Sequence, residues 1–121
     1  GKLIPFEYKT GGWKDSKKST MRQEMAFYQL MIENAEEEVL AKHGLTKDMK
    51  VTHWGWYYPV ANHIFVEEIK KRSMTALMHN FAKLIHAYES KNFEAKFWQQ
   101  TCSQYCSYYG ICPAAQDNTW L

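Results

Sequence analysis

Residues 50–66, "KVTHWGWYYPVANHIFV", decide which fold class this chain can adopt. The segment 50–58 is rich in aromatic and β-branched residues, which favour strands, and Pro59 closes it. The segment 63–66, "HIFV", is a short apolar run that can pair with the first segment across "PVAN". The sequence therefore predicts a β-hairpin in the middle of the chain.

The segment before this hairpin is predicted to form a strand and a helix. Residues 2–9 alternate in character and place Ile4, Phe6 and Tyr8 on one strongly apolar face. Pro5 lacks a backbone donor and favours an edge position. Thr20 and Gln23 match a capping box, which predicts a helix over residues 20–42.

The segment after the hairpin is predicted to form a second long helix over residues 68–90. One stripe of apolar side chains runs along it, and we expect this stripe to pack in the core. The stripe consists of Met74, Leu77, Met78, Phe81, Leu84, Ile85 and Tyr88. Strand, helix, two strands, helix and a cysteine-bearing tail predict one mixed α/β domain over 1–121 with too few strands to look complete.

The composition narrows the class of protein further. The chain has 121 residues, of which 45% are hydrophobic, so it can bury a core. It begins with Gly, and we expect further residues upstream. A net charge of +2 neither favours nor excludes a polyanionic partner. No apolar run reaches the roughly 18 residues that a membrane span needs, so we expect no membrane contact. The three cysteines are an odd number, which a set of disulfides would leave with one unpaired thiol, so we expect a reducing, cytoplasmic location.

Glu7 and Lys9 lie two residues apart in the predicted strand, so their side chains share one face. A carboxylate there can hold a divalent cation that polarises a phosphate, and an ammonium group one step away can orient the attacking water. The backbone carbonyl of Tyr8 is a further candidate oxygen ligand. The alternative is a solvated strand face on which the two charges have no chemical role.

Thr10-Gly11 follows this strand, and "RQEMAFYQLMIE" (22–33) opens the next helix. With these motifs the chain resembles the C-terminal part of the PD-(D/E)XK nuclease superfamily. The resemblance is to its RecB-type exonuclease domains and to the iron–sulfur nucleases of CRISPR adaptation. In that family a strand ending in Asp/Glu-x-Lys-Thr-Gly precedes a helix carrying Gln-x-x-x-Tyr. The resemblance implies a restriction-endonuclease-like core, incomplete on its N-terminal side, over 1–91 and a cysteine tail over 92–121.

The resemblance also implies roles for individual residues. Glu7 and the carbonyl of Tyr8 would bind Mg²⁺ or Mn²⁺, and Lys9 would position the water. The family's glutamine position holds Glu24 in this chain, one helical turn before Tyr28, so both would support the phosphate or the metal shell. The family's aspartate is not among the six residues before Glu7, and we expect it in an upstream part of the same domain.

The tail carries Cys102, Cys106 and Cys112 in a C-x3-C-x5-C spacing among aromatic residues. Closely spaced thiolates suit an iron–sulfur cluster or zinc. The resembled nucleases place three cysteines after their last long helix and a fourth upstream, which implies a structural 4Fe-4S cluster here. Three residues separate Cys102 from Cys106, where two are usual in this family. Zinc with a histidine such as His53 or His63, and simple buried thiols, are the alternatives.

Basic side chains cluster between the predicted strand and its helix. In a nuclease they would contact the phosphates of DNA without reading its sequence, and the alternative is an ordinary solvated loop. These residues are Lys14, Lys17, Lys18 and Arg22.

Aromatic residues dominate the predicted strand 50–58. They can stack on single-stranded bases or pack in the core, and core packing is the simpler interpretation. These residues are Trp54, Trp56, Tyr57 and Tyr58.

The sequence thus leads us to expect a metal-dependent DNA exonuclease that acts on single strands or ends, with a helicase or an integrase-type protein as a possible partner. One alternative is a non-catalytic nucleic-acid-binding module of the same fold. The other is a small zinc-binding interaction domain.

Overall fold

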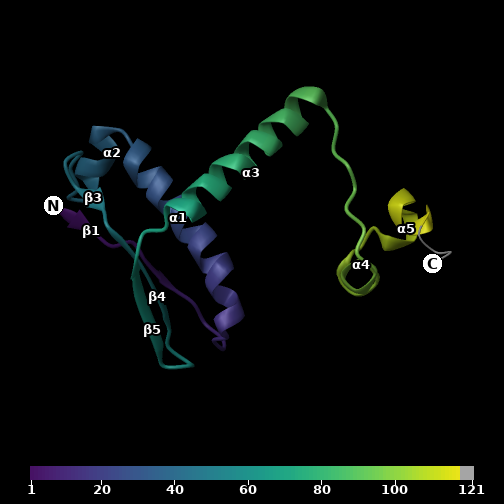
Figure 1. Cartoon of the computed structure of the whole chain (residues 1–121), viewed down its shortest axis with the longest axis horizontal. Helices are drawn as coiled ribbons and strands as arrows, with labels where there is room; N and C mark the ends of the chain where they lie inside the picture. Colours follow the sequence, from purple (N-terminus) through teal and green to yellow (C-terminus); the bar gives the residue numbers. More distant parts are fainter. Residues whose placement is uncertain (118–121) are drawn as a thin grey trace. The chain divides into compact units, whose positions relative to one another are not determined.

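The computed structural model describes residues 1–117 and has a mixed α/β fold (Figure 1). The chain divides into two compact units, residues 1–83 and residues 84–121, with the boundary inside helix α3. The first unit contains β1 (Lys2–Leu3), β2 (Phe6–Tyr8), the 3₁₀ turn η1 (Asp15–Lys17), α1 (Lys18–Asn34), α2 (Glu37–Lys42), β3 (Lys50–Val51), β4 (His53–Tyr58), β5 (His63–Glu68) and the first part of α3 (Lys71–Ser90).

The predicted hairpin is confirmed. Strands β4 and β5 pair antiparallel, with Tyr58 opposite His63 at the turn end and His53 opposite Glu68 at the other end. Asn62 closes the turn with a φ of 45°, a left-handed conformation that asparagine tolerates better than most residues. Strand β2 joins the opposite edge of β4 in parallel, so the sheet order is β2-β4-β5.

The two predicted strands at 2–9 and 50–58 are each interrupted. Leu3 pairs with Val51, but Phe6 pairs with Gly55, so the second strand has one extra residue between the two ladders. An extra residue of this kind is a β-bulge, and it divides the pairing into β1-β3 and β2-β4. Pro5, which cannot donate a backbone hydrogen bond, lies at this break.

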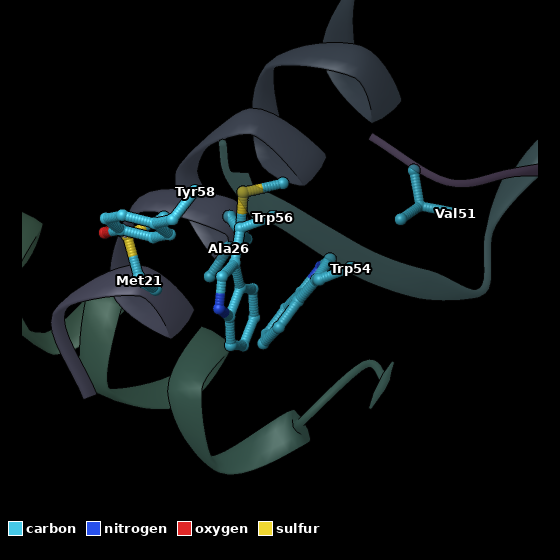
Figure 2. Packing of buried hydrophobic residues seen from close by; sticks show 7 residues of the cluster. Met21, Ala26, Val51, Trp54, Trp56 and Tyr58 are labelled. Atoms are coloured by element: carbon cyan, nitrogen blue, oxygen red, sulfur yellow. Dashed lines mark hydrogen bonds between the residues drawn. The ribbon is translucent and has the colours of Figure 1, made fainter. Parts of the chain in front are cut away.

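The core of the first unit lies between the sheet and α1 (Figure 2). Trp54 and Trp56 are fully buried there. Because of the bulge, the side chains that reach the core step from Val51 to Trp54 and then follow every second residue, to Trp56 and Tyr58. The remaining members of the core cluster are Met21, Met25, Ala26 and Tyr58.

The predicted helix 20–42 is wrong in two details. It begins at Lys18, directly from the preceding 3₁₀ turn, so Thr20 lies inside the helix and is no cap. It also ends at Asn34, because Ala35 and Glu36 adopt extended backbone before α2 begins. The Asn34 side chain donates to the carbonyl of Leu30. That bond satisfies one of the carbonyls a helix end leaves open.

Helix α3 begins at Lys71 rather than Glu68, which belongs to β5, and it contains no buried residue. Its stripe is only partly in the core: Met74 and Leu77 pack against the cluster, and the Phe81 ring lies 5.9 Å from that of Phe27. The core expectation is wrong for the other stripe residues, which nothing within residues 1–117 buries. These exposed residues are Met78, Leu84, Ile85 and Tyr88.

The second unit contains short helices in the tail that showed no sequence period. These are α4 (Gln99–Tyr105), the 3₁₀ turn η2 (Tyr109–Ile111) and α5 (Pro113–Asp117). The last four positions of the predicted tail, 118–121, lie outside the described residues. Among residues 1–117, no helix combines the length and the apolar character that crossing a membrane requires.

Candidate active site

The predicted residues Lys9 and Glu24 form an ion pair between β2 and α1. The Lys9 Nζ atom lies 3.0 Å from Oε2 of Glu24 and donates a hydrogen bond of 3.2 Å to Oε1. Both side chains are partly covered, with 36% and 29% of their surface exposed. The hydrogen bond to Glu24 is the main cause that raises the pKa of Lys9, and the charges of Glu24 and Glu7 add to it. Lys9 is therefore held in its charged form.

Tyr28 links the two carboxylates of the site. Its hydroxyl group donates a hydrogen bond of 3.3 Å to Oε1 of Glu24. A hydrogen bond to Glu7, followed by burial and by the charges of both glutamates, raises the pKa of Tyr28 to about 12. The structure thus brings together the four residues predicted to be catalytic. We call Glu7, Lys9, Glu24 and Tyr28 the carboxylate cluster.

The local structure explains why these side chains meet. Lys9 reaches Glu24 on α1, so the odd-numbered side chains of β2 face the helix, Glu7 among them. Glu24 and Tyr28 are one helical turn apart, so they project from the same side of α1. The apolar face of β2 points away instead, and Tyr8 is 69% exposed. Glu7 and Lys9 therefore do not lie on the open face of the sheet.

The carbonyl of Tyr8 lies on the open edge of β2. The backbone N–H group of Lys9 donates to the carbonyl of Tyr57, and that of Gly55 donates to the carbonyl of Pro5. The backbone groups of the odd-numbered residues around β2 therefore point toward β4. In a parallel ladder the intervening residue directs its backbone groups to the other side. Among the described strands β2 has a neighbour on one side only, and the Tyr8 carbonyl faces the free side.

The oxygen atoms of Glu7 and Glu24, together with the Tyr8 carbonyl at the neighbouring strand edge, suit a hard divalent cation. Two carboxylates and one backbone carbonyl are oxygen ligands of the kind that Mg²⁺ and Mn²⁺ prefer. Residues 1–117 contain no group of three or more histidine, cysteine, aspartate or glutamate side chains placed to hold a metal ion. A cation at Glu7 and Glu24 would therefore draw its remaining ligands from water, substrate or residues beyond this range.

The four predicted basic residues have separate surroundings. The Lys17 ammonium lies 5.2 Å from the ring centroid of Tyr58 and donates to the carbonyl of Gly12. The Lys18 ammonium lies 4.6 Å from the ring centroid of Phe65. Arg22 makes a two-pronged ion pair with Glu67 of β5. Lys14 is exposed just before η1.

The three cysteines have free thiols in short helical segments of the second unit. Cys102 lies in α4, Cys106 follows its last residue, and Cys112 precedes α5. The Cys102 sulfur accepts a hydrogen bond from the backbone of Trp98 at 3.4 Å. Cys106 is exposed and the other two are half-buried, so all three can be reached by a ligand from solvent.

The aromatic residues of β4 belong mainly to the core. Trp54, Trp56 and Tyr58 are buried, so core packing rather than base stacking is confirmed for these three. Tyr57 is half-buried on the opposite face, beside Tyr8. Of the two histidines considered for zinc, His63 stacks on Trp13 with the ring centroids 4.3 Å apart, and a ring nitrogen of His53 lies 2.9 Å from the Thr52 hydroxyl.

Two polar contacts were not foreseen from the sequence. One is the pair Arg22–Glu67, and the other is the bond from the Trp54 indole to Gln29, buried between sheet and helix. Each joins residues at least 25 positions apart, so no local spacing signals it. No family model matches the chain, and comparisons with curated proteins and with solved structures likewise find no match.

Proposed function

We propose that this chain is part of a divalent-metal-dependent deoxyribonuclease that hydrolyses phosphodiester bonds, with the carboxylate cluster as its active site. The observation that carries the proposal is the convergence of Glu7, Lys9, Glu24 and Tyr28 on one side of β2. Exonuclease action on single strands or ends, and a helicase or integrase-type partner, are the finer parts of the proposal and rest on the sequence resemblance.

The proposed reaction is an in-line hydrolysis. The oxygen of water attacks the phosphorus, one P–O bond breaks, and the leaving oxygen takes up a proton. Glu7 and the Tyr8 carbonyl would hold Mg²⁺ or Mn²⁺, which would supply positive charge at the phosphate when bound. Lys9 is charged and orients the water or balances the charge that develops in the transition state. Tyr28 stays neutral at physiological pH, and its hydroxyl group donates to the Glu24 carboxylate.

The open edge of β2 supports a further part of the proposal. A strand with unpaired backbone groups on one side can accept another strand there. We propose that an upstream segment of the same domain pairs with this edge and brings an additional acidic ligand. The three cysteines would hold a structural 4Fe-4S cluster together with a fourth cysteine from that segment, and zinc is the alternative metal.

The test is degradation of labelled DNA, single-stranded and double-stranded, in Mg²⁺ and in Mn²⁺. Glu7→Gln and Lys9→Met are expected to lower the rate by at least about 100-fold, because each removes a charge that acts on the reacting phosphate. Glu68→Gln and Lys2→Met remove the same charges from exposed strand positions and serve as matched controls. Digestion that stays unchanged in Glu7→Gln and Lys9→Met while both remain folded would refute the assignment.

The competing candidate is a non-catalytic nucleic-acid-binding module. Residues 1–117 offer the cluster two carboxylates and no third acidic side chain, and this favours that candidate if no further ligand is supplied. It predicts DNA binding that survives Glu7→Gln and no metal-dependent cleavage by the protein that contains this chain.

A further inference from the structure

A second polar site lies between α1 and the beginning of α3, within the first unit. It is a cleft of about 310 Å³. The side chains around it include two guanidinium groups, two hydroxyl groups and one amide, and no carboxylate. They belong to Ser19, Arg22, Gln23, Arg72, Ser73 and Ala76. A cleft lined by several donors with positive charge suits an anion.

Arg22 is held rigidly at this cleft. Its Nε and Nη2 atoms bond the two carboxylate oxygens of Glu67 at 2.6 and 2.8 Å, and the Glu67 side chain is only 9% exposed. The Nη1 atom of Arg22 has no hydrogen-bond partner within residues 1–117. The ion pair therefore fixes the guanidinium plane, and the remaining N–H groups of Arg22 are available to a ligand.

Arg72 lies in the first turn of α3 and brings a second guanidinium group to the cleft. It forms no ion pair within the described part of the chain, and the first turn of α3 contains no acidic residue. Lys70 and Lys71 precede it in the sequence. Positive side chains at the positive end of a helix repel its dipole, so this arrangement costs stability unless an anion binds there.

The two serines complete the donor set. Neither the Ser19 nor the Ser73 hydroxyl group forms a hydrogen bond with another residue in the 1–117 range. Two guanidinium groups and two hydroxyl groups form a donor set of the kind that binds the oxygens of a phosphate group.

We propose that this cleft binds a phosphate group. The cleft is separate from the carboxylate cluster, because Arg22 and Glu24 project from α1 about 160° apart. Arg22 contacts Glu67 of β5, and Glu24 contacts Lys9 at the end of β2, on the opposite edge of the sheet. The phosphate belongs either to a nucleic-acid strand, which rests on the proposed function, or to a free phosphate-bearing molecule.

The experiment is an NMR titration of the full chain, without divalent metal, with inorganic phosphate and with a short single-stranded oligonucleotide. Arg72→Gln removes one guanidinium from the cleft without exposing a buried group. Lys71→Gln is the matched control, because it removes the same charge one position earlier and does not line the cleft. Arg22→Gln is avoided, since it would leave the Glu67 carboxylate buried without its partner.

We expect Arg72→Gln to weaken binding about tenfold, and Lys71→Gln to change it less than about twofold. A tenfold loss for the oligonucleotide identifies a strand phosphate, and a loss for inorganic phosphate alone identifies a free ligand. Equal effects of the two variants, or none, would overturn the proposal. The titration is done without divalent metal, which cleavage requires, so a failure of the nuclease assignment and a failure of the cleft are distinguishable.

Discussion

Lys9, directly after β2, and Glu24 on α1 are 15 positions apart, and their side chains meet with Nζ 3.0 Å from Oε2. The contact joins the edge strand to the helix that covers the sheet. The hydrogen bond to Glu24, followed by the charges of Glu24 and Glu7, raises the pKa of Lys9 and so keeps it positively charged. This arrangement has consequences for stability that can be measured independently of any activity.

A double-mutant cycle of Lys9→Met and Glu24→Gln should give a coupling energy of about 0.5–1 kcal/mol, because the pair is partly exposed. The measurement is urea unfolding of the wild type, both single variants and the double variant. The exposed pair Lys42–Glu38, at 3.7 Å, is the control and should give only a few tenths of a kcal/mol, about what such helix pairs contribute. Equal coupling in the two pairs would contradict the geometry described here.

Tyr28 should make stability depend on pH in the alkaline range. Its pKa is raised from 10.0 to about 12 in the folded chain, so the folded state holds the proton more tightly than the unfolded state. The resulting stability is fully present below about pH 10 and is lost as the pH rises toward 12. Tyr28→Phe should flatten this decline, measured as unfolding free energy against pH. An identical decline in Tyr28→Phe would show that the hydroxyl is not held by the two glutamates.

Removal of the buried amide of Gln29 should lower the stability of the fold. Its Oε1 atom accepts a hydrogen bond of 3.0 Å from the fully buried Trp54 indole. Gln29→Leu leaves that N–H group without an acceptor and should lower the unfolding free energy by about 1–3 kcal/mol. Gln23→Leu, on the same helix outside the core, is the control. A loss for Gln29→Leu no larger than that for Gln23→Leu would argue against the bond.

A side chain at Gly55 should destabilise the fold, because this glycine pairs with Phe6 where β2 lies beside β4. A Cβ atom at this position would overlap the ring of Phe6 on the neighbouring strand. Gly55→Ala should therefore destabilise the fold by about 1–3 kcal/mol, as overpacking does elsewhere. At Gly12 a Cβ atom would meet open space, so Gly12→Ala is the matched control. Thermal melts that coincide for the two variants would rule out the parallel pairing of Phe6 with Gly55.

The cysteines give a prediction that does not depend on catalysis. Anaerobic reconstitution with iron and sulfide should produce a brown protein with broad absorbance, and each of Cys102→Ser, Cys106→Ser and Cys112→Ser should lower the iron content. Ser103→Ala, an exposed change on α4, should leave it unchanged. A colourless protein that binds stoichiometric zinc instead would establish the zinc alternative. A protein that binds neither metal would leave the thiols without a ligand role.

Local patterns in the sequence determined the hairpin, the mixed α/β class and the presence of both long helices. These features depend on alternation, helical periodicity and turn residues within a few positions of one another. The placement of Glu24 and Tyr28 on one helix face also followed from spacing alone. The bulge between Val51 and Trp54 did not, because a single extra residue leaves no signal until the partner strand is in register.

Only the tertiary structure decided which face of β2 meets α1. That choice brings Glu7 and Lys9 to Glu24 and Tyr28 on the helix. The sequence showed an apolar face and a charged face on this strand, and burial alone would place the apolar face inward. The structure places the charged face under the helix, because its register with β4 is set by the pairing of Phe6 with Gly55. The cleft beside Arg22 and Arg72 also depends on tertiary structure, because its lining comes from two helices that are far apart in the sequence.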